Sequence, residues 1–126
     1  MRTTPLALVV DDEEAFREIV SMKLRASNFD AETARGALEA VEKAEAIHPD
    51  LILMDIQMPV MNGLEAIARL RGNARFAETP IIALTALAMP GDRERSLLAG
   101  ANEYMSKPVS LKLLARTINE LLGKQA

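Results

Sequence analysis

The chain has 126 residues, of which 49% are apolar and 26% are charged, and a formal net charge of −3, as expected for one soluble globular domain. It has no cysteine, which excludes disulfides and zinc–thiolate sites, and its few aromatic residues and lack of a basic cluster argue against direct nucleic-acid binding. No apolar run approaches the length of about 20 residues that a membrane span needs, and no signal peptide is recognisable, so we expect a cytoplasmic protein without membrane contact.

Apolar runs and helical periodicity alternate along the whole chain. In chain order they predict a strand at 6–10, a helix at 15–26, a weaker strand at 31–34, a helix at 36–47, a strand at 51–54, a short helix at 64–71, a strand at 80–84, a helix at 90–99, a strand at 103–105 and a helix at 111–122. Gly100 and Ser110 are the expected helix caps, and residues 72–79 form the longest irregular stretch. Continuous apolar strands that alternate with helices predict an α/β domain with a parallel sheet covered on both faces.

Polar residues directly follow four of these strands. They are Asp11 and Asp12, Asp55, Thr85 and Lys107. Because parallel strands end at the same edge of a sheet, we expect these side chains to meet in one crevice. Three carboxylates and one ammonium group leave excess negative charge that a hard divalent cation would neutralise. Carboxylate oxygens without an imidazole or thiolate ligand select Mg²⁺ or Ca²⁺ over zinc or copper, and Mg²⁺ commonly bridges to phosphate. The set therefore favours phosphoryl chemistry with Asp55 as the nucleophile.

Each of these residues has an ordinary structural explanation when it is taken alone. The Asp11–Asp12 pair is typical of a helix N-cap, and Asp55 is acceptable in a turn. Thr85 can be a simple strand-end hydroxyl, and Lys107 a loop residue. Their complementary charges at one edge of one sheet favour a functional site.

Four segments, VVDDEE, LILMDIQMPVMNG, IIALTA and AGANEYMSKPV, resemble the signature of response-regulator receiver domains. The resemblance covers essentially the whole chain, 1–126, read as one receiver domain with no output domain. It implies a flavodoxin-like, doubly wound fold with five helices and the strand order 2-1-3-4-5. The protein would be either a stand-alone response regulator of a two-component phosphorelay or a piece of a hybrid histidine kinase.

The resemblance also implies roles for the residues of the crevice. Asp55 would accept a phosphoryl group from a sensor histidine kinase or a histidine phosphotransfer protein. Asp12, Asp55 and the backbone carbonyl of Gln57 would hold Mg²⁺, with Asp11 helping through water, and Lys107 would pair with the phosphoryl group. Such a protein is a signalling module and not an enzyme with a separate substrate; it catalyses only its own phosphorylation and slow autodephosphorylation.

Thr85 and Tyr104 match the switch pair of the same family. The Thr85 hydroxyl would move toward the phosphoryl group, and the Tyr104 ring would turn inward and change partner binding. A static, half-buried Tyr104 ring is the alternative. The resemblance further implies a cis bond before Pro108, and Leu87 suggests slow loss of the phosphoryl group because it cannot orient a water molecule.

The first helix carries two apolar stripes. Phe16, Val20 and Leu24 form a core face, whereas the second stripe consists of Ala15, Ile19 and Met22. The second stripe is either a docking surface for the phosphodonor or an extension of the buried face.

Two other functions are less consistent with the residues. A haloacid-dehalogenase-like phosphatase needs a second aspartate two residues after its nucleophile, where this chain has Gln57. A flavodoxin-like cofactor binder needs phosphate-cradling glycines in its first loop, where this chain has DDEE.

Overall fold

The computed structural model describes residues 4–58, 61–86, 88–107 and 109–123. The elements are β1 (Leu6–Val10), α1 (Glu14–Ala26), β2 (Asp30–Ala34), α2 (Ala37–Ile47), β3 (Leu51–Asp55), α3 (Gly63–Arg71), the 3₁₀ helix η1 (Ala74–Phe76), β4 (Ile81–Thr85), α4 (Asp92–Ala99), β5 (Glu103–Ser106) and α5 (Leu111–Gly123). The expectations for Leu87 and Pro108 lie outside the described residues.

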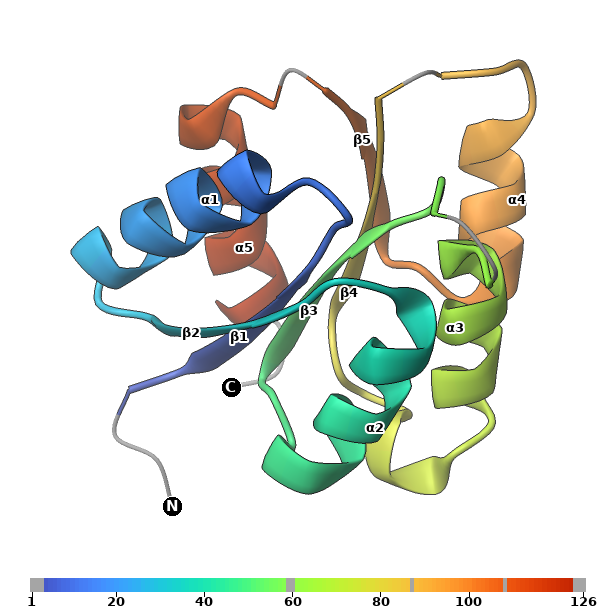
Figure 1. Ribbon diagram of the computed structural model, residues 1–126, viewed down its shortest axis with the longest axis horizontal. Coiled ribbons are helices and arrows are strands. Elements are labelled where there is room, and N and C mark those ends of the chain that lie inside the picture. The colour runs from blue at the N-terminus through green and yellow to red at the C-terminus, as the bar shows by residue number, and fades with distance from the viewer. Residues whose placement is uncertain (1–3, 59–60, 87, 108, 124–126) are drawn as a thin grey trace.

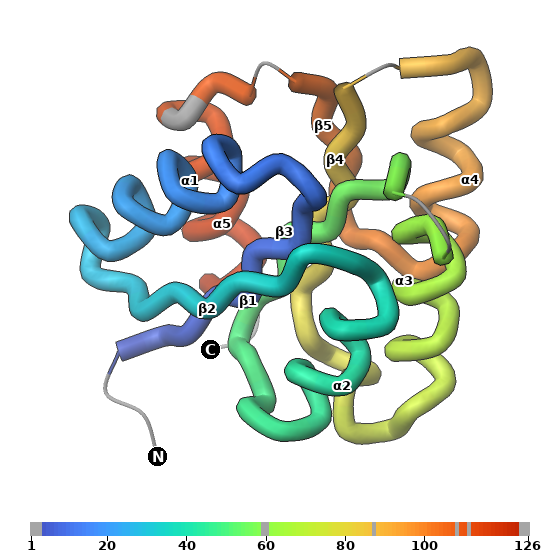
Figure 2. The backbone as a smooth tube through the Cα atoms, viewed as in Figure 1, coloured from blue at the N-terminus to red at the C-terminus, as the bar shows by residue number. Residues whose placement is uncertain are grey.

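The five strands form one parallel sheet in the order β2-β1-β3-β4-β5, so the predicted α/β class and strand order are confirmed. Every residue of β1, β3 and β4 is buried, as their continuous apolar runs predicted. The edge strand β2 alternates between buried and more exposed residues instead. The backbone trace in Figure 2 shows the sheet running through the centre of the molecule.

Helices cover both faces of the sheet, α1 and α5 on one side and α2, α3 and α4 on the other (Figure 1). Side chains alternate along each strand, so Leu8 and Val10 join the core under α2 and α3, whereas Ala7 and Val9 join the core under α1 and α5. Within the described part of the chain, no helix has the length and apolar character needed to cross a bilayer.

The observed boundaries differ from the predicted ones by a few residues. Asp55 and Thr85 are the last residues of their strands and do not lie beyond them, which ties both side chains to the rigid sheet. The stretch 72–79, predicted to be irregular, contains η1, because the Asn73 side chain accepts a hydrogen bond from the Arg75 backbone N–H at 3.0 Å and the Phe76 ring is buried. The caps at Gly100 and Ser110 are confirmed.

The start of α3 packs directly on the backbone that follows β3. A Cβ atom on Gly63 would lie 2.2 Å from the Asp55 carbonyl oxygen and 2.7 Å from the Ile56 Cα, so only glycine fits here. The Gly63 N–H also donates to the Ile56 carbonyl at 3.3 Å. The sequence indicated only a turn at this glycine, but the structure shows that it sets how closely α3 approaches Asp55.

Candidate functional site

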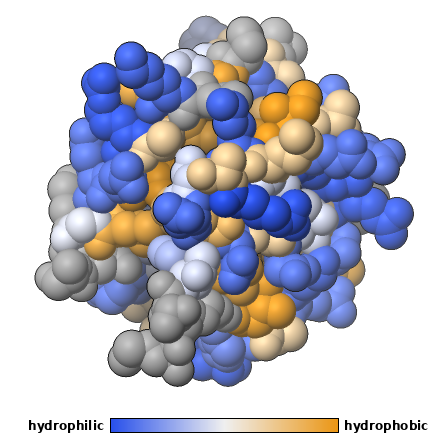
Figure 3. Space-filling model, turned by 90° about the vertical axis from the view of Figure 1, so that its left-hand side faces the viewer, coloured by the Kyte–Doolittle hydropathy of each residue, from blue (hydrophilic) through white to orange (hydrophobic). Residues whose placement is uncertain are grey.

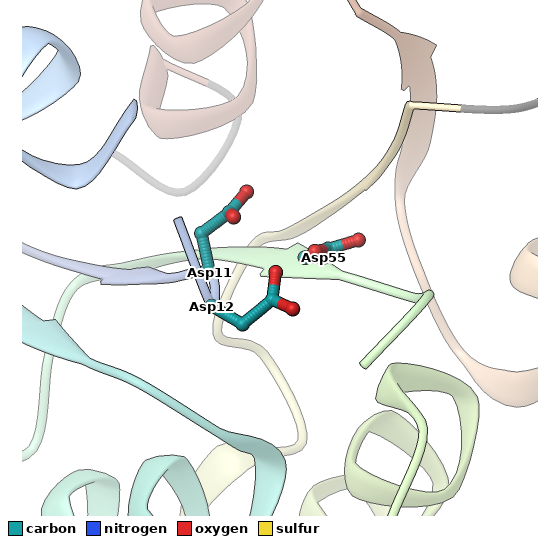
Figure 4. Close-up of side chains that lie close together, drawn as sticks. All are labelled: Asp11, Asp12 and Asp55. Atoms are coloured by element: carbon teal, nitrogen blue, oxygen red, sulfur yellow. The ribbon is translucent and has the colours of Figure 1, made fainter. Parts of the chain in front are cut away.

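Three carboxylates meet at the carboxyl ends of the two central strands. Asp11 and Asp12 follow β1, Asp55 ends β3, and one oxygen of each lies within 4.8 Å of an oxygen of the other two. Figure 4 shows the three side chains gathered at this edge of the sheet. Asp11 and Asp55 are buried, with 0% and 3% of their surface exposed, whereas Asp12 is exposed. The predicted crevice therefore has two inner carboxylates and one at its mouth.

The two buried carboxylates are oriented by the turns that they begin. One oxygen of Asp11 accepts a hydrogen bond from the Glu13 backbone N–H at 2.9 Å, and one oxygen of Asp55 accepts from the Gln57 N–H at 2.9 Å. The N-cap of α1 is Glu13, and no side chain caps the helix there. The alternative of Asp11 or Asp12 as an ordinary N-cap is therefore wrong, while the turn expected at Asp55 is present.

Lys107 reaches across the crevice from the end of β5. Its ammonium nitrogen lies 2.5 Å from Asp11 Oδ2 and 3.6 Å from Glu13 Oε1, and only 11% of its side chain is exposed. The Lys107 backbone N–H donates to the Thr85 carbonyl at 2.7 Å, which fixes the residue beside β4. Burial by itself would lower the pKa of Lys107, but the bond to Asp11 and the charges of Asp55 and Glu13 raise it above its usual value.

The electrostatics of the crevice disfavour the charged form of Asp55. Burial raises the pKa of Asp55 from 3.8 to about 6; the hydrogen bond from Gln57 opposes this rise, Asp11 and Asp12 add to it, and Lys107 opposes it. One ammonium group thus does not balance the carboxylates. Hard oxygen donors with excess negative charge are suited to Mg²⁺ or Ca²⁺, so the residues present fit the predicted cation.

Thr85, Tyr104 and Gln57 lie around this cluster. Thr85 is fully buried at the end of β4, next to β3, and Gln57 is exposed in the turn after Asp55. Tyr104 is half-buried on β5, and its hydroxyl oxygen is buried without a hydrogen-bond partner among the described residues. Burial and, to a smaller extent, the charge of Asp92 raise the pKa of the Tyr104 hydroxyl. The structure shows one position of this ring, so its switching stays a prediction.

The second apolar stripe of α1 faces solvent. Ile19 is 55% and Met22 is 68% exposed, whereas Val20 and Leu24 are buried. The proposal that this stripe extends the buried face is therefore wrong. Figure 3, which views the molecule from the α1 side of Figure 1, shows apolar patches among hydrophilic residues on this face.

Two contacts from the first turns of α1 were not predicted from the sequence. The Arg17 guanidinium donates to the Asp11 carbonyl oxygen at 2.7 Å, and the Lys107 ammonium lies 4.2 Å from the centroid of the Phe16 ring. Both residues lie one to two helical turns after Asp12, which is the only signal for them in the sequence. The identity of their partners depends on how α1 packs.

The chain is similar to known proteins in sequence and in fold. The model of the family described as response regulator receiver domain matches residues 7–119. The polar-differentiation response regulator DivK of Brucella ovis is 39% identical over 120 residues, which cover 95% of this chain and 98% of the relative.

Solved structures give the same result. The chemotaxis protein CheY4 of Vibrio cholerae is 31% identical, with a TM-score of 0.88 over 94% of this chain and 99% of that one. The receiver domain of a signal transduction histidine kinase from Syntrophus aciditrophicus is 32% identical, with a TM-score of 0.88 over 95% of this chain and 91% of that one. The chain therefore belongs to the response regulator receiver domain family and has the phosphoacceptor function of two-component signalling.

Proposed function

We propose that Asp55 is the phosphoacceptor of this receiver domain. An oxygen of its carboxylate attacks the phosphorus of a phosphohistidine on a sensor histidine kinase or histidine phosphotransfer protein. The new oxygen–phosphorus bond makes an acyl phosphate, and the phosphorus–nitrogen bond breaks and leaves the electron pair on the donor imidazole, which takes up a proton. The observation that carries the proposal is the position of Asp55, held at the end of β3 beside two carboxylates and across from Lys107.

Receiver domains bind Mg²⁺ in an acidic pocket, and in this chain the residues that would hold it are Asp12, Asp55 and the carbonyl of Gln57, with Asp11 acting through water. When bound, Mg²⁺ neutralises charge on the phosphoryl oxygens. The three clustered carboxylates and the raised pKa of Asp55 support this assignment.

The remaining residues act on the phosphoryl group or respond to it. Lys107 pairs with its oxygens, a role supported by the burial of its side chain in the crevice and by the attraction between its charge and that of Asp55. The Thr85 hydroxyl moves toward it, and the Tyr104 ring then takes a new position that changes partner binding. The Tyr104 hydroxyl supports this idea, because it has no hydrogen bond to a described residue that would hold the ring in its present position. Slow autodephosphorylation returns the protein to its resting state.

Mass spectrometry tests the phosphoacceptor directly. After incubation with acetyl phosphate and Mg²⁺, the intact protein should gain the mass of one phosphoryl group, and Asp55→Asn should gain none. Asp30→Asn, which removes an exposed carboxylate on β2, is the control and should be phosphorylated normally. A phosphoryl group on Asp55→Asn would refute the assignment.

The exposed stripe of Ala15, Ile19 and Met22 is the proposed docking surface for the phosphodonor, because it lies on the helix that follows the acidic loop. Met22→Glu should slow phosphotransfer from a donor protein but not phosphorylation by acetyl phosphate. Leu38→Glu, at an exposed leucine on α2, is the matched control. Equal transfer rates for wild type and Met22→Glu would place the surface elsewhere.

The switch needs a separate test, because it acts after phosphorylation. Tyr104→Ala should still be phosphorylated but should bind the downstream partner less well in that state. Unimpaired binding by phosphorylated Tyr104→Ala would argue that the ring is static.

A further inference from the structure

The Lys107 ammonium has three close neighbours, and one of them is an aromatic ring. Asp11 Oδ2 lies 2.5 Å from the nitrogen, Glu13 Oε1 lies 3.6 Å away, and the centroid of the Phe16 ring lies 4.2 Å away. A cation this close to a ring centroid is attracted by the negative face of the ring. Because little of the Lys107 side chain is exposed, water screens this attraction weakly.

Phe16 is the rigid member of this group. Its ring is half-buried and packs against the core under α1 and α5, in line with the buried Val20 and Leu24 on the same helix. The Glu13 side chain is 66% exposed, so solvent competes for its contact with the ammonium. The ring therefore gives Lys107 a contact that carries no formal charge and is less exposed to solvent than the Glu13 carboxylate.

Asp11, the strongest partner of Lys107, also belongs to the carboxylate cluster. Its Oδ1 accepts from the Glu13 N–H, and its Oδ2 contacts Lys107, so each oxygen of the carboxylate already has one partner. Any negative charge that Asp11 shares with a divalent cation weakens its attraction for the ammonium. An aromatic ring is not a ligand for a hard cation, so its contact with Lys107 persists in either state.

We propose that Phe16 is a positioning residue for Lys107. Its ring keeps the ammonium in the crevice when Asp11 also shares its charge with a divalent cation, and so favours a phosphoryl group on Asp55. This inference rests on the proposed function of Asp55, Lys107 and the carboxylate cluster. It adds a residue that touches neither the phosphoryl group nor the metal.

Binding of beryllofluoride, an analogue of the phosphoryl group, tests the proposal without any turnover. The dissociation constant for beryllofluoride, measured by ¹⁹F NMR in saturating Mg²⁺, should be about 3- to 10-fold larger for Phe16→Leu than for the wild type. Phe16→Tyr keeps an aromatic face and should stay within about 2-fold of the wild type. Affinity for Mg²⁺ alone, measured by calorimetry, should not change.

Phe29→Leu is the control for a loss of packing, because Phe29 packs against the same core cluster. It should bind beryllofluoride like the wild type. If Phe16→Leu does not fold, Phe16→Met gives the same comparison.

Equal affinity in wild type and Phe16→Leu would overturn the proposal, as would Phe16→Tyr binding as weakly as Phe16→Leu. Failure of the wild-type protein to bind beryllofluoride would instead overturn the proposed function, and the role of Phe16 with it.

Discussion

Charged groups gather at both ends of the sheet, and the two clusters differ in how their charge is balanced. At the carboxyl ends, three carboxylates face the single ammonium of Lys107. At the amino ends, the Arg71 guanidinium, at the end of α3, donates to the Gly100 carbonyl at 2.8 Å, to the Phe76 carbonyl at 2.6 Å and to Asn102 Oδ1 at 2.8 Å. Asn102 Oδ1 also accepts from the backbone N–H of Ile81 at 2.8 Å.

The difference separates a structural cluster from a functional one. Arg71 finds three acceptors within the protein on two segments, η1 and the connection between α4 and β5, so its interactions hold the domain together. The acidic crevice holds more carboxylates than ammonium groups, and burial together with the charges of Asp11 and Asp12 raises the pKa of Asp55. Helix α3 joins the two clusters, with Gly63 against Asp55 at one end and Arg71 at the other.

The largest expected effect concerns the amino-terminal cluster. Arg71→Met should lower the free energy of unfolding by about 4 kcal/mol, because three acceptors lose a charged donor. Urea denaturation measures this loss, and phosphorylation by acetyl phosphate should persist in the folded fraction. Arg69→Met, which removes an exposed arginine from the same helix, should leave the free energy of unfolding nearly unchanged. An unchanged free energy of unfolding for Arg71→Met would remove the contrast between the two clusters.

Gly63→Ala breaks the connection between α3 and the crevice. The added Cβ would overlap the Asp55 carbonyl, so α3 must shift, and we expect a loss of about 3 kcal/mol in urea denaturation. Because the shift moves the Asp55 backbone, phosphorylation should slow as well, in contrast to Arg71→Met. Gly123→Ala, where a Cβ meets open space, is the control. Normal stability of Gly63→Ala would mean that the close approach of α3 is not needed.

The pH dependence of stability reports how the buried, acidic surroundings of Asp55 act on its charge. The pKa of Asp55 is higher in the folded protein, at about 6, than its ordinary value of 3.8, so the folded state binds the proton more tightly. The stabilising contribution of the protonated Asp55 is complete when the pH is below 3.8, and it is lost as the pH rises through about 6. Without Mg²⁺, the stability of the wild type relative to Asp55→Asn should fall by about 2 kcal/mol between pH 4 and pH 7.

Denaturation curves of the two proteins across this pH range supply the measurement. Added Mg²⁺ should restore part of the loss at pH 7, because it binds the folded state. A difference that is independent of pH would show that the crevice balances its own charge.

The smallest effect lies at Tyr104, whose hydroxyl belongs to neither cluster. Tyr104→Phe removes a buried oxygen that has no hydrogen-bond partner in the described part of the chain, and it should raise stability by about 1 kcal/mol. Thermal unfolding of the unphosphorylated protein provides the comparison. A destabilised Tyr104→Phe would reveal a hydrogen bond from this hydroxyl in solution.

Most of the fold was predictable because helices and strands depend on periodicity that local sequence carries. The apolar runs at β1, β3 and β4 gave buried strands, and Gly100 and Ser110 marked helix ends. The short helix η1 was not predicted, because Phe76 has no periodic neighbours and is buried only through tertiary packing. Likewise, Arg71 looked like the end of a helix, and its three acceptors come from distant or irregular segments.

For the site, the residues that follow each apolar run were enough to name the chemical groups at the carboxyl edge of the sheet, because a parallel sheet brings the residues at its strand ends together. Asp11, Asp12, Asp55, Thr85 and Lys107 could be named on that basis. The contacts that hold these residues could not be read from the sequence. Asp11 is held by Lys107 and Arg17, and Lys107 contacts the Phe16 ring. The close approach of α3 to Asp55 requires that position 63 has no side chain. These contacts depend on distances between elements that are far apart in the sequence, and helix packing fixes such distances where local pattern does not.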